Sequence, residues 1–390
     1  MDHRLDVLIV GSGLVGGSMA CALAQGGLKV GLIDPKLPEK TATQDPRMSA
    51  IAYGSYQFLK HWGILSHLNN PPEPILEIHT SQAGTYGRLS YTSEEIGGDP
   101  LGYMIPNREL RLAVMKQTQT FANLQRFIPD RIQQFNVTPR CVEVALESGI
   151  QLEASLLIVA DGKQSTLREQ LGISCIKRDY HQQGVIFNLK CGVPHHNRAY
   201  EHFMPEGPLA VLPMPDQCVS VVWTQTNACA DRLLNLSPQR LIQAFQSRFG
   251  YGLGKLELAS TPIAYPLSLI LPKEMIRPRI ALIGDAAHSI HPVAGQGVNV
   301  GFRDNHRLAE LLLEYKTLGL DLGGETLLKT YRNARRYDVW SMAGITHGLV
   351  HLFSRKEASV RTLRKWGMQA VEQLPPLKRF LINHARGLSH

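Results

Sequence analysis

Runs of apolar residues and their spacing divide the chain into candidate strands and helices. Leu5 to Val10 is apolar apart from Asp6, which predicts a buried parallel strand. A glycine-rich turn and a helix follow, and the helix ends near Gly26-Gly27. The run Lys29–Ile33 predicts a second strand, closed by Asp34. This order of elements is a strand–helix–strand unit.

Two further buried strands are predicted far along the chain. Leu156–Ala160 precedes Asp161-Gly162, and Ile280–Ile283 precedes Gly284-Asp285. Strand ends that carry Gly or Asp recur at sites where a parallel sheet binds a ligand. We therefore expect one sheet that is assembled from distant segments of an α/β domain.

Residues 184–266 follow a different pattern, in which short β-type runs alternate with turns. The runs are Val185–Leu189, Leu209–Leu212, Val219–Thr226 and Ile263–Leu267. They predict an antiparallel sheet inserted into the α/β domain, to which residues 71–104 add further strands. After Asn299 the pattern is helical, with helices expected over Val300–Tyr315 and Leu327–Val339. Helix is also expected from there to the end, apart from a break at Pro375-Pro376.

Composition narrows the class of protein. A hydrophobic content of 44% and a charged content of 19% are typical of a soluble globular chain. The six cysteines are scattered without a Cys-x-x-Cys pair, which favours reduced thiols in a cytosolic protein over a zinc site. Val7–Ala24 is long and apolar enough to resemble a membrane span, but four glycines interrupt it and Asp6 precedes it. We expect neither a transmembrane segment nor export.

Much of the net charge of +8 lies near the C-terminus. Residues 355–390 contain eight Lys or Arg and two Glu, a net charge of +6. One interpretation is a solvated helix face, and the other is a surface that meets anionic lipid or an acidic partner. Aromatic and basic residues do not interleave as in nucleic-acid-binding proteins, so no nucleic acid is expected.

The first glycine turn has the pattern G-x-G-x-x-G, formed by Gly11, Gly13 and Gly16. Its place between a strand and a helix lets a pyrophosphate approach the N–H groups at the helix N-terminus. Asp34 ends the second strand, where its carboxylate can accept ribose hydroxyls. These features predict dinucleotide binding, with a glycine-rich packing turn as the alternative. The motif does not distinguish FAD from NAD.

Three other segments carry candidate chemistry. Asp45-Pro46-Arg47 offers a guanidinium that could neutralise a phosphate, although a surface ion pair is the alternative. Asp161-Gly162 opens a second turn, which reads A-D-G-x-x-S-x-x-R with Ala160. The run Gly284–Asn299 reads G-D-A-A-H-x-x-x-P-x-x-G-Q-G-x-N and places a carboxylate before the start of a helix.

These motifs, in this order, resemble those of the single-component FAD-dependent aromatic hydroxylases. Finer matches resemble the hydroxylases of ubiquinone biosynthesis, close to the 2-polyprenyl-6-methoxyphenol hydroxylase type. They include Leu101-Gly102-Tyr103, Ala199-Tyr200-Glu201-x-Phe203, Gly207-Pro208-Leu209, Tyr265-Pro266-Leu267 and Gly301-x-Arg303-Asp304. The resemblance covers nearly the whole chain and is weakest after about residue 345.

The resemblance implies a role for each motif. Gly11, Gly13 and Gly16 would hold the FAD pyrophosphate, Asp34 the adenosine ribose and Arg47 the phosphates. Asp161 and Gly162 would serve the FAD side and the nicotinamide partner. The run Gly284–Asn299 would hold the ribityl chain and the flavin ring through Gly284, Asp285, Pro292, Gly295, Gln296, Gly297 and Asn299. No catalytic base is indicated, and His288 and His291 are interpreted as structural.

The resemblance also implies a fold and its domains. A Rossmann-like FAD-binding domain would comprise residues 1–70, 105–175 and 268–345. Residues 71–104 and 176–267 would form the inserted antiparallel-sheet substrate domain, and residues 346–390 a C-terminal helical segment. No metal site is expected.

The implied reaction is hydroxylation of a polyprenylated phenol by O₂ through a flavin C4a-hydroperoxide. NAD(P)H would be the co-substrate, bound transiently without a Rossmann motif of its own. Alternatives are a flavoprotein reductase of a prenyl lipid, a halogenase, a non-catalytic flavin-binding subunit and a plain NAD dehydrogenase. A halogenase is disfavoured because its W-x-W-x-I-P signature is absent from the sequence.

The expected location follows from the prenylated substrate. We expect a cytoplasmic protein, peripheral at the inner face of the cytoplasmic membrane and attached through residues 340–390. A complex of ubiquinone-biosynthesis enzymes and a homo-oligomer are also considered as partners.

Overall fold

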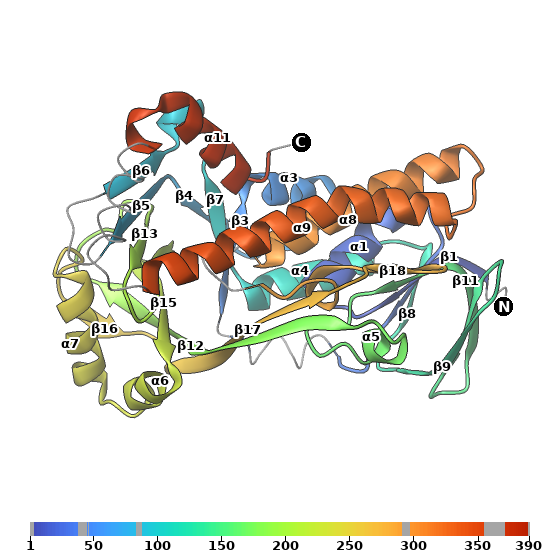
Figure 1. Ribbon diagram of the computed structural model, residues 1–390, viewed down its shortest axis with the longest axis horizontal. Helices are drawn as coiled ribbons and strands as arrows, with labels where there is room; N and C mark the ends of the chain where they lie inside the picture. Colours follow the sequence, from blue (N-terminus) through green and yellow to red (C-terminus); the bar gives the residue numbers. More distant parts are fainter. Residues whose placement is uncertain are drawn as a thin grey trace.

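A mostly parallel sheet with helices packed on it forms one half of the molecule (Figure 1). The computed structural model describes residues 4–37, 45, 47–82, 88–290, 297–354 and 371–388. The order in the sheet is β18-β19-β11-β1-β2-β8, with β10 on β11 and β9 on β10. The strands are β1 (Arg4–Val10), β2 (Val30–Ile33), β8 (Leu124–Phe127), β9 (Ile132–Val137), β10 (Val142–Leu146), β11 (Gln151–Val159), β18 (Ile276–Arg277) and β19 (Ile280–Leu282).

The prediction of one sheet built from distant segments is confirmed. Val10 of β1 lies beside Val159 of β11, and Val159 lies beside Leu282 of β19, with all three strands parallel. These strands are buried on both faces, as their continuous apolar sequences require. The loops that follow them therefore emerge at one edge of the sheet.

Helices from distant parts of the chain pack around this sheet and on one another. They are α1 (Leu14–Gln25), α3 (Tyr53–His61), α4 (Asn107–Thr118), α5 (Thr166–Gln170), α8 (Gly297–Thr317) and α9 (Glu325–Ser354). The helices α8 and α9 are longer than the sequence pattern predicts. Asn305 Nδ2 of α8 donates to Val15 O (2.7 Å) and Ser18 Oγ (2.9 Å) of α1, which fixes the two helices against each other.

The other half of the molecule is built on the second sheet, with order β16-β12-β15-β14-β13-β5-β6 and β17 on β12. Its strands are β5 (Glu77–Gln82), β6 (Arg88–Thr92), β12 (Cys175–Cys191), β13 (Arg198–Phe203), β14 (Leu209–Met214), β15 (Cys218–Thr226), β16 (Leu256–Leu258) and β17 (Ile263–Pro272). The predicted strand Val185–Leu189 is only part of β12. Its polar first half pairs with β17 as a ribbon that reaches the parallel sheet, with an irregularity between Asp179 and Gln182 (Figure 1).

The two faces of the second sheet have different surroundings. Phe187, Val211 and Trp223 point to one face, where α6 (Asn227–Leu234) and α7 (Pro238–Phe249) cover them with Phe245. Side chains one position along each strand point to the opposite face. On that face Ala199 and Leu212 pack with Met104 and Ile75 in a smaller apolar cluster.

A small third sheet contributes to that cluster. It joins β3 (Met48–Ala52), β7 (Gly102–Pro106) and β4 (Glu73–Ile75), with β7 in the middle. Residues 71–104 thus divide between two sheets, since β5 and β6 extend the second sheet while β4 and β3 each pair with β7. The helix α11 (Pro375–Ala385) adds Ile382 to the cluster. The Pro pair expected to break a helix stands in the first turn of α11, where proline is tolerated.

The cysteines and the apolar stretch near the N-terminus have the following places in the described residues. All six cysteines are free thiols. No group of His, Cys, Asp or Glu within the described ranges could hold a metal ion. Val7–Ala24 divides into β1, the glycine turn and α1, and no described helix is long and apolar enough to cross a bilayer.

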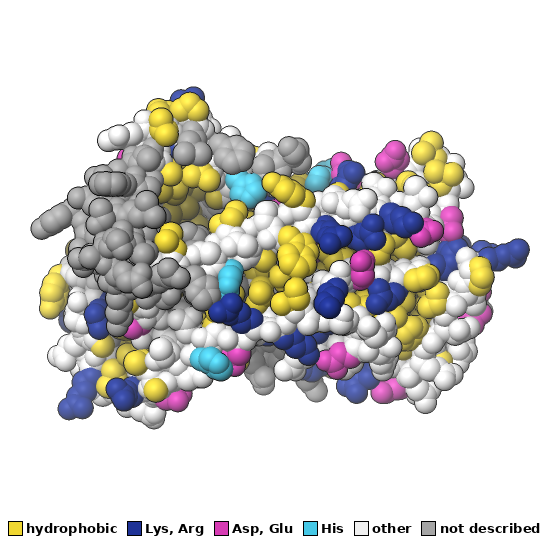
Figure 2. Space-filling view, in the orientation of Figure 1, with side chains coloured by type: hydrophobic (Ala, Val, Ile, Leu, Met, Phe, Trp, Pro, Cys, Tyr) yellow, Lys and Arg dark blue, Asp and Glu magenta, His cyan; other side chains and the backbone are white. Residues whose placement is uncertain are grey.

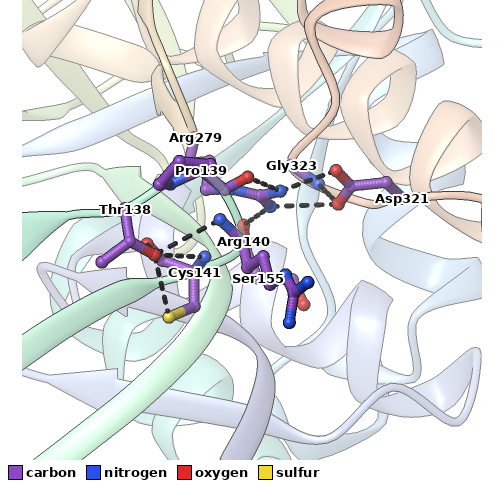
Figure 3. A network of polar contacts seen from close by, with 8 residues as sticks. All are labelled: Thr138, Pro139, Arg140, Cys141, Ser155, Arg279, Asp321 and Gly323. Atoms are coloured by element: carbon purple, nitrogen blue, oxygen red, sulfur yellow. Dashed lines mark hydrogen bonds and ion pairs between the residues drawn. The ribbon is translucent and has the colours of Figure 1, made fainter.

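Arg279 joins three segments at the edge of the parallel sheet opposite the glycine turn (Figure 3). It stands between β18 and β19 with φ +56°. Its guanidinium donates to Pro139 O, to Ser155 O and, through both Nη atoms, to Asp321 Oδ1 (3.0 Å) and Oδ2 (2.7 Å). The turn after β9, the strand β11 and the loop before α9 therefore depend on one side chain.

Replacing this side chain, as in Arg279→Met, is expected to lower the free energy of unfolding by about 2 kcal/mol, because buried carbonyls lose their donor. Urea denaturation measures the change. Arg277→Met is the matched control, since among the described residues the Arg277 guanidinium binds only the adjacent Ile276 O. Equal stability of the two variants would show that the Arg279 contacts contribute nothing.

Candidate functional site

The first glycine turn is shaped both by contacts within the chain and by space for a ligand. Gly11 has φ +105°, and a Cβ there would overlap the carbonyl oxygen of Ala160. A Cβ on Gly16 would overlap the carbonyl oxygen of Gly11. A Cβ on Gly13, by contrast, would meet no atom within 4 Å. Two glycines are therefore required by packing, and the third leaves the start of α1 open to a phosphate.

Asp34 lies where the sequence predicts the ribose-binding carboxylate. Its Oδ2 accepts hydrogen bonds from Ser12 N (2.7 Å) and Ser12 Oγ (2.8 Å), so the carboxylate and the glycine turn are adjacent. A largely apolar cavity of about 160 Å³ opens beside them, a suitable place for a purine ring. Its lining includes Ser12, Leu32, Val114, Met115, Arg126 and Ile128.

Arg47 is held by Asp45 and by the second sheet. Its Nε and Nη2 donate to the two carboxylate oxygens of Asp45, each at 2.7 Å, and its guanidinium lies 5.0 Å from the ring centre of Tyr265. Burial alone would raise the pKa of Asp45, but the hydrogen bonds and charge of Arg47 lower it overall. The bidentate ion pair thus positions the guanidinium between the two halves of the molecule.

The second turn is fastened to the third by Arg168, which is fully buried. Its Nη1 donates to Ala286 O and its Nη2 to Lys163 O, each at 3.0 Å. In the same turn, Asp161 Oδ1 is buried and accepts no hydrogen bond from the described residues. Burial raises the pKa of Asp161, which hydrogen bonds only partly offset. A carboxylate in this state can accept a hydrogen bond from a ligand.

Asp285 is exposed to solvent, yet the surrounding protein desolvates its carboxylate and raises its pKa. The charges of His288, Lys163 and Arg47 partly oppose this shift. The second turn, the third turn and the Asp45–Arg47 segment therefore contribute charged groups around Asp285. A carboxylate that is exposed but poorly hydrated is expected at a ligand site, where the bound ligand provides the hydrogen bonds that water does not.

His288 has the structural role that the sequence indicates. Its Nε2 lies 2.6 Å from Asp304 Oδ2, and both side chains are inaccessible to solvent. Asp304 also accepts from Gly284 N (2.9 Å) and from Arg335 Nε (2.7 Å) of α9. Burial alone would raise the pKa of Asp304, but His288 and Arg335 lower it overall. The network anchors the Gly284–Asp285 turn to α8 and α9.

The sequence did not indicate this network. Asp304 lies in the Gly301-x-Arg303-Asp304 motif, which suggests no partner for its carboxylate. Arg335 is on α9, and only the fold brings α9 against the turn. Tyr265 and Ser12 likewise gain their places beside Arg47 and Asp34 from tertiary contacts.

The start of α8 is the last part of the site. Pro292, Gly295 and Gln296, with His291, lie outside the described residues, so their roles stay predictions. Gly297 begins α8, and Asn299 in its first turn accepts from Ala52 N and donates to Ala50 O, each at 2.9 Å. The Asn299 side chain therefore ties the start of α8 to β3.

The assembled residues fit a dinucleotide that extends along the sheet edge. The cavity beside Ser12, the open space at Gly13 and the unsatisfied Asp161 Oδ1 follow one another along that edge. Asp285, on the turn after β19, and the start of α8 come next. The fold and the site together define a dinucleotide-binding protein of the flavin-dependent type.

Comparison with known proteins gives the family. The model of the FAD binding domain family matches residues 4–345, so the chain belongs to this family and uses FAD as its cofactor. Ubiquinone hydroxylase UbiL of Rhodospirillum rubrum is 39% identical over 388 residues, covering 99% of this chain and 90% of the relative. The 3-demethoxyubiquinol 3-hydroxylase of Escherichia coli is 30% identical over 398 residues, covering 99% and 100%.

Solved structures confirm the fold. PqsL, a probable FAD-dependent monooxygenase from Pseudomonas aeruginosa, superimposes with a TM-score of 0.80 at 18% sequence identity, covering 94% of this chain and all of the other. The expected architecture, a Rossmann-like FAD-binding fold with a second sheet and a helical C-terminal part, is therefore confirmed.

Proposed function

We propose that the protein is an FAD- and NAD(P)H-dependent monooxygenase that hydroxylates the aromatic ring of a polyprenylated phenol in ubiquinone biosynthesis. The full-length similarity to ubiquinone hydroxylases carries this proposal. The site agrees with it, because FAD at the edge of the parallel sheet would lie next to the second sheet, which can shield a reacting ring from water. Bound FAD, once reduced by NAD(P)H, supplies the oxygen-activating chemistry.

The test is a reaction with labelled O₂. The purified holoenzyme, supplied with NAD(P)H and a short-chain prenylphenol, is expected to give a ring-hydroxylated product that carries one labelled oxygen atom. A reduced product without label would identify a prenyl-lipid reductase instead. Deleting the gene and identifying the accumulated quinone precursor then shows which hydroxylation the enzyme performs.

We further propose that the enzyme associates peripherally with the inner face of the cytoplasmic membrane, where a prenylated substrate resides. The outer face of α9 supports this proposal, because Tyr337 (82% exposed), Trp340 (41%) and Ile345 (50%) are accessible beside Arg332 and Arg336. Figure 2 shows hydrophobic side chains gathered on this side of the molecule among Lys and Arg side chains. Exposed aromatic and basic side chains together suit the interface of an anionic bilayer.

Vesicle sedimentation tests this membrane proposal. The holoenzyme is expected to bind vesicles that contain anionic lipid, and Trp340→Glu to reduce that binding about tenfold while FAD content is unchanged. Tyr251→Glu, at an exposed aromatic residue before β16, is the control. If Trp340→Glu instead dissociates a homo-oligomer or a complex with other enzymes and leaves vesicle binding intact, the α9 surface is a protein interface.

A further inference from the structure

Glu201 on β13 is a carboxylate that the contacts described above do not use. No hydrogen bond or ion pair reaches it from the part of the chain that the structure describes. It is half-buried, yet desolvation alone raises the pKa of Glu201 to about 7. Like Asp161 and Asp285, it combines solvent access with desolvation that raises its pKa. An unpaired carboxylate in such surroundings destabilises the fold, which points to a role with a ligand.

The register of the second sheet places Glu201 on the face opposite α6 and α7. Its cross-strand neighbours are Ala210 of β14 and Thr80 of β5. Tyr200 and His202, on either side of it in the strand, point to the helix-covered face. Ala199, two residues before Glu201 and on its side of the sheet, belongs to the apolar cluster with Met104.

That face is the one next to the FAD site. Ala50 of β3 packs on the same apolar cluster, and its carbonyl accepts the hydrogen bond from Asn299 at the start of α8. Tyr265 of β17 pairs with Gly184 of β12, and the register through β15 and β14 places it on the same face as Glu201. There the Tyr265 ring lies against Arg47. Glu201 therefore lies on the wall that faces the start of α8, where the resemblance places the flavin ring.

We propose that the Glu201 carboxylate accepts the hydrogen bond of the substrate's ring hydroxyl and takes its proton as oxygen is transferred to the ring. This inference rests on the proposed function. The hydroxyl O–H bond breaks, its electron pair stays on the ring oxygen, and the proton forms a new O–H bond on Glu201. The electron-rich ring is then a better nucleophile. Because Glu201 is partly accessible to solvent, it releases this proton to water after the reaction.

The groups around Glu201 decide how it titrates. Its neighbours on β5 and β14, Thr80 and Ala210, do not ionise. The titratable group that β6 places on this face is Tyr91, and burial raises the pKa of Tyr91 to about 12. From the FAD side, Arg47 lies against Tyr265 and interacts with the charge of Asp285. Because Tyr91 stays neutral below pH 10, Glu201 is the group on this stretch of the sheet that ionises near neutral pH.

The first test measures the ionisation of a bound phenol without turnover. A short-chain nitrophenol, whose ionised form absorbs visible light, is titrated in the holoenzyme. In the parent enzyme the negative charge of the Glu201 carboxylate disfavours ionisation of the adjacent phenol. Glu201→Gln removes this charge, so the pH at which half of the bound nitrophenol is ionised is expected to fall by about one unit or more. Glu77→Gln, which removes a carboxylate from adjacent β5, is the matched control and should leave the midpoint unchanged. An unchanged midpoint in Glu201→Gln would overturn the proposal.

The second test is kinetic. The parent kcat should fall as the pH drops through about 7, because the base must be ionised. Glu201→Gln should lower kcat about 100-fold, lose this acid limb and keep FAD binding, while Glu201→Asp should restore part of the rate. Since removing a desolvated charge does not weaken the fold, Glu201→Gln should unfold at no lower a temperature than the parent. If the parent hydroxylates no phenol, the proposed function fails; if parent and Glu201→Gln hydroxylate equally fast with the same pH profile, only the role of Glu201 fails.

Discussion

A Gly13→Leu protein is expected to fold normally and to remain colourless, because FAD no longer binds. Gly13 has φ −63° and ψ −174°, a conformation open to any residue, and no described atom lies within 4 Å of the added Cβ. The new side chain would instead occupy the space in front of the α1 N-terminus, where the pyrophosphate lies. We expect FAD affinity to fall at least 100-fold, about 3 kcal/mol.

Flavin absorbance and equilibrium titration with FAD measure this loss, and thermal unfolding of the FAD-free proteins shows whether the fold is intact. Gly16→Ala is the contrasting variant, since its methyl group would overlap the Gly11 carbonyl oxygen. That variant should unfold at a lower temperature even without FAD. Stoichiometric FAD in the purified Gly13→Leu protein would refute the assignment of this turn to the pyrophosphate.

The Arg335→Met variant is expected to lose about 3 to 5 kcal/mol of stability, the cost of leaving a buried charge without its partner. Arg335 binds Asp304 Oδ1 at 2.7 Å, and the Asp304 side chain is inaccessible to solvent. Arg307→Met on α8 removes an exposed ion pair with Glu310 and should change the stability by less than about 0.5 kcal/mol. Similar unfolding midpoints in urea for Arg335→Met and the parent would contradict the prediction.

The pH dependence of stability gives an independent check on this network. The pKa of Asp304 is lowered in the folded protein, so its contribution is present above the unfolded pKa of about 4 and is lost as the pH falls through the folded value. Without Arg335 the folded pKa of Asp304 must rise. The stability deficit of Arg335→Met is therefore expected to be largest at neutral pH and to shrink on acidification.

The sequence predicted those features that depend on local pattern. The strand Leu5–Val10, the glycine turn and the helix after it form a contiguous unit whose apolar spacing and turn residues indicate the structure directly. The places of Asp161 and Asp285 beside that turn were also predictable, since the loops after adjacent parallel strands emerge at one sheet edge.

Features that depend on tertiary contacts were not predictable in this way. The first half of β12 is polar and forms a two-stranded ribbon with β17. A search for apolar runs therefore predicts only Val185–Leu189 of this long strand. The helices α3, α4, α6 and α7 were not predicted, because their apolar positions are few and their burial comes from the sheets they cover. Glu201 stood in a recognised motif, but only the sheet register shows which face carries its carboxylate.

The ribbon of β12 and β17 has a consequence for how this fold can be recombined. Asp179 and Ser268 are paired across the ribbon at its irregularity, while Leu269 and Leu271 beyond them belong to the core of the parallel sheet. A short turn that joins Asp179 to Ser268 would therefore close the chain on the FAD-binding half and leave that core whole. Between these two positions the main part of the second sheet from a related enzyme could be grafted beside β5 and β6, exchanging substrate preference while Tyr265 is kept against Arg47 of the cofactor site.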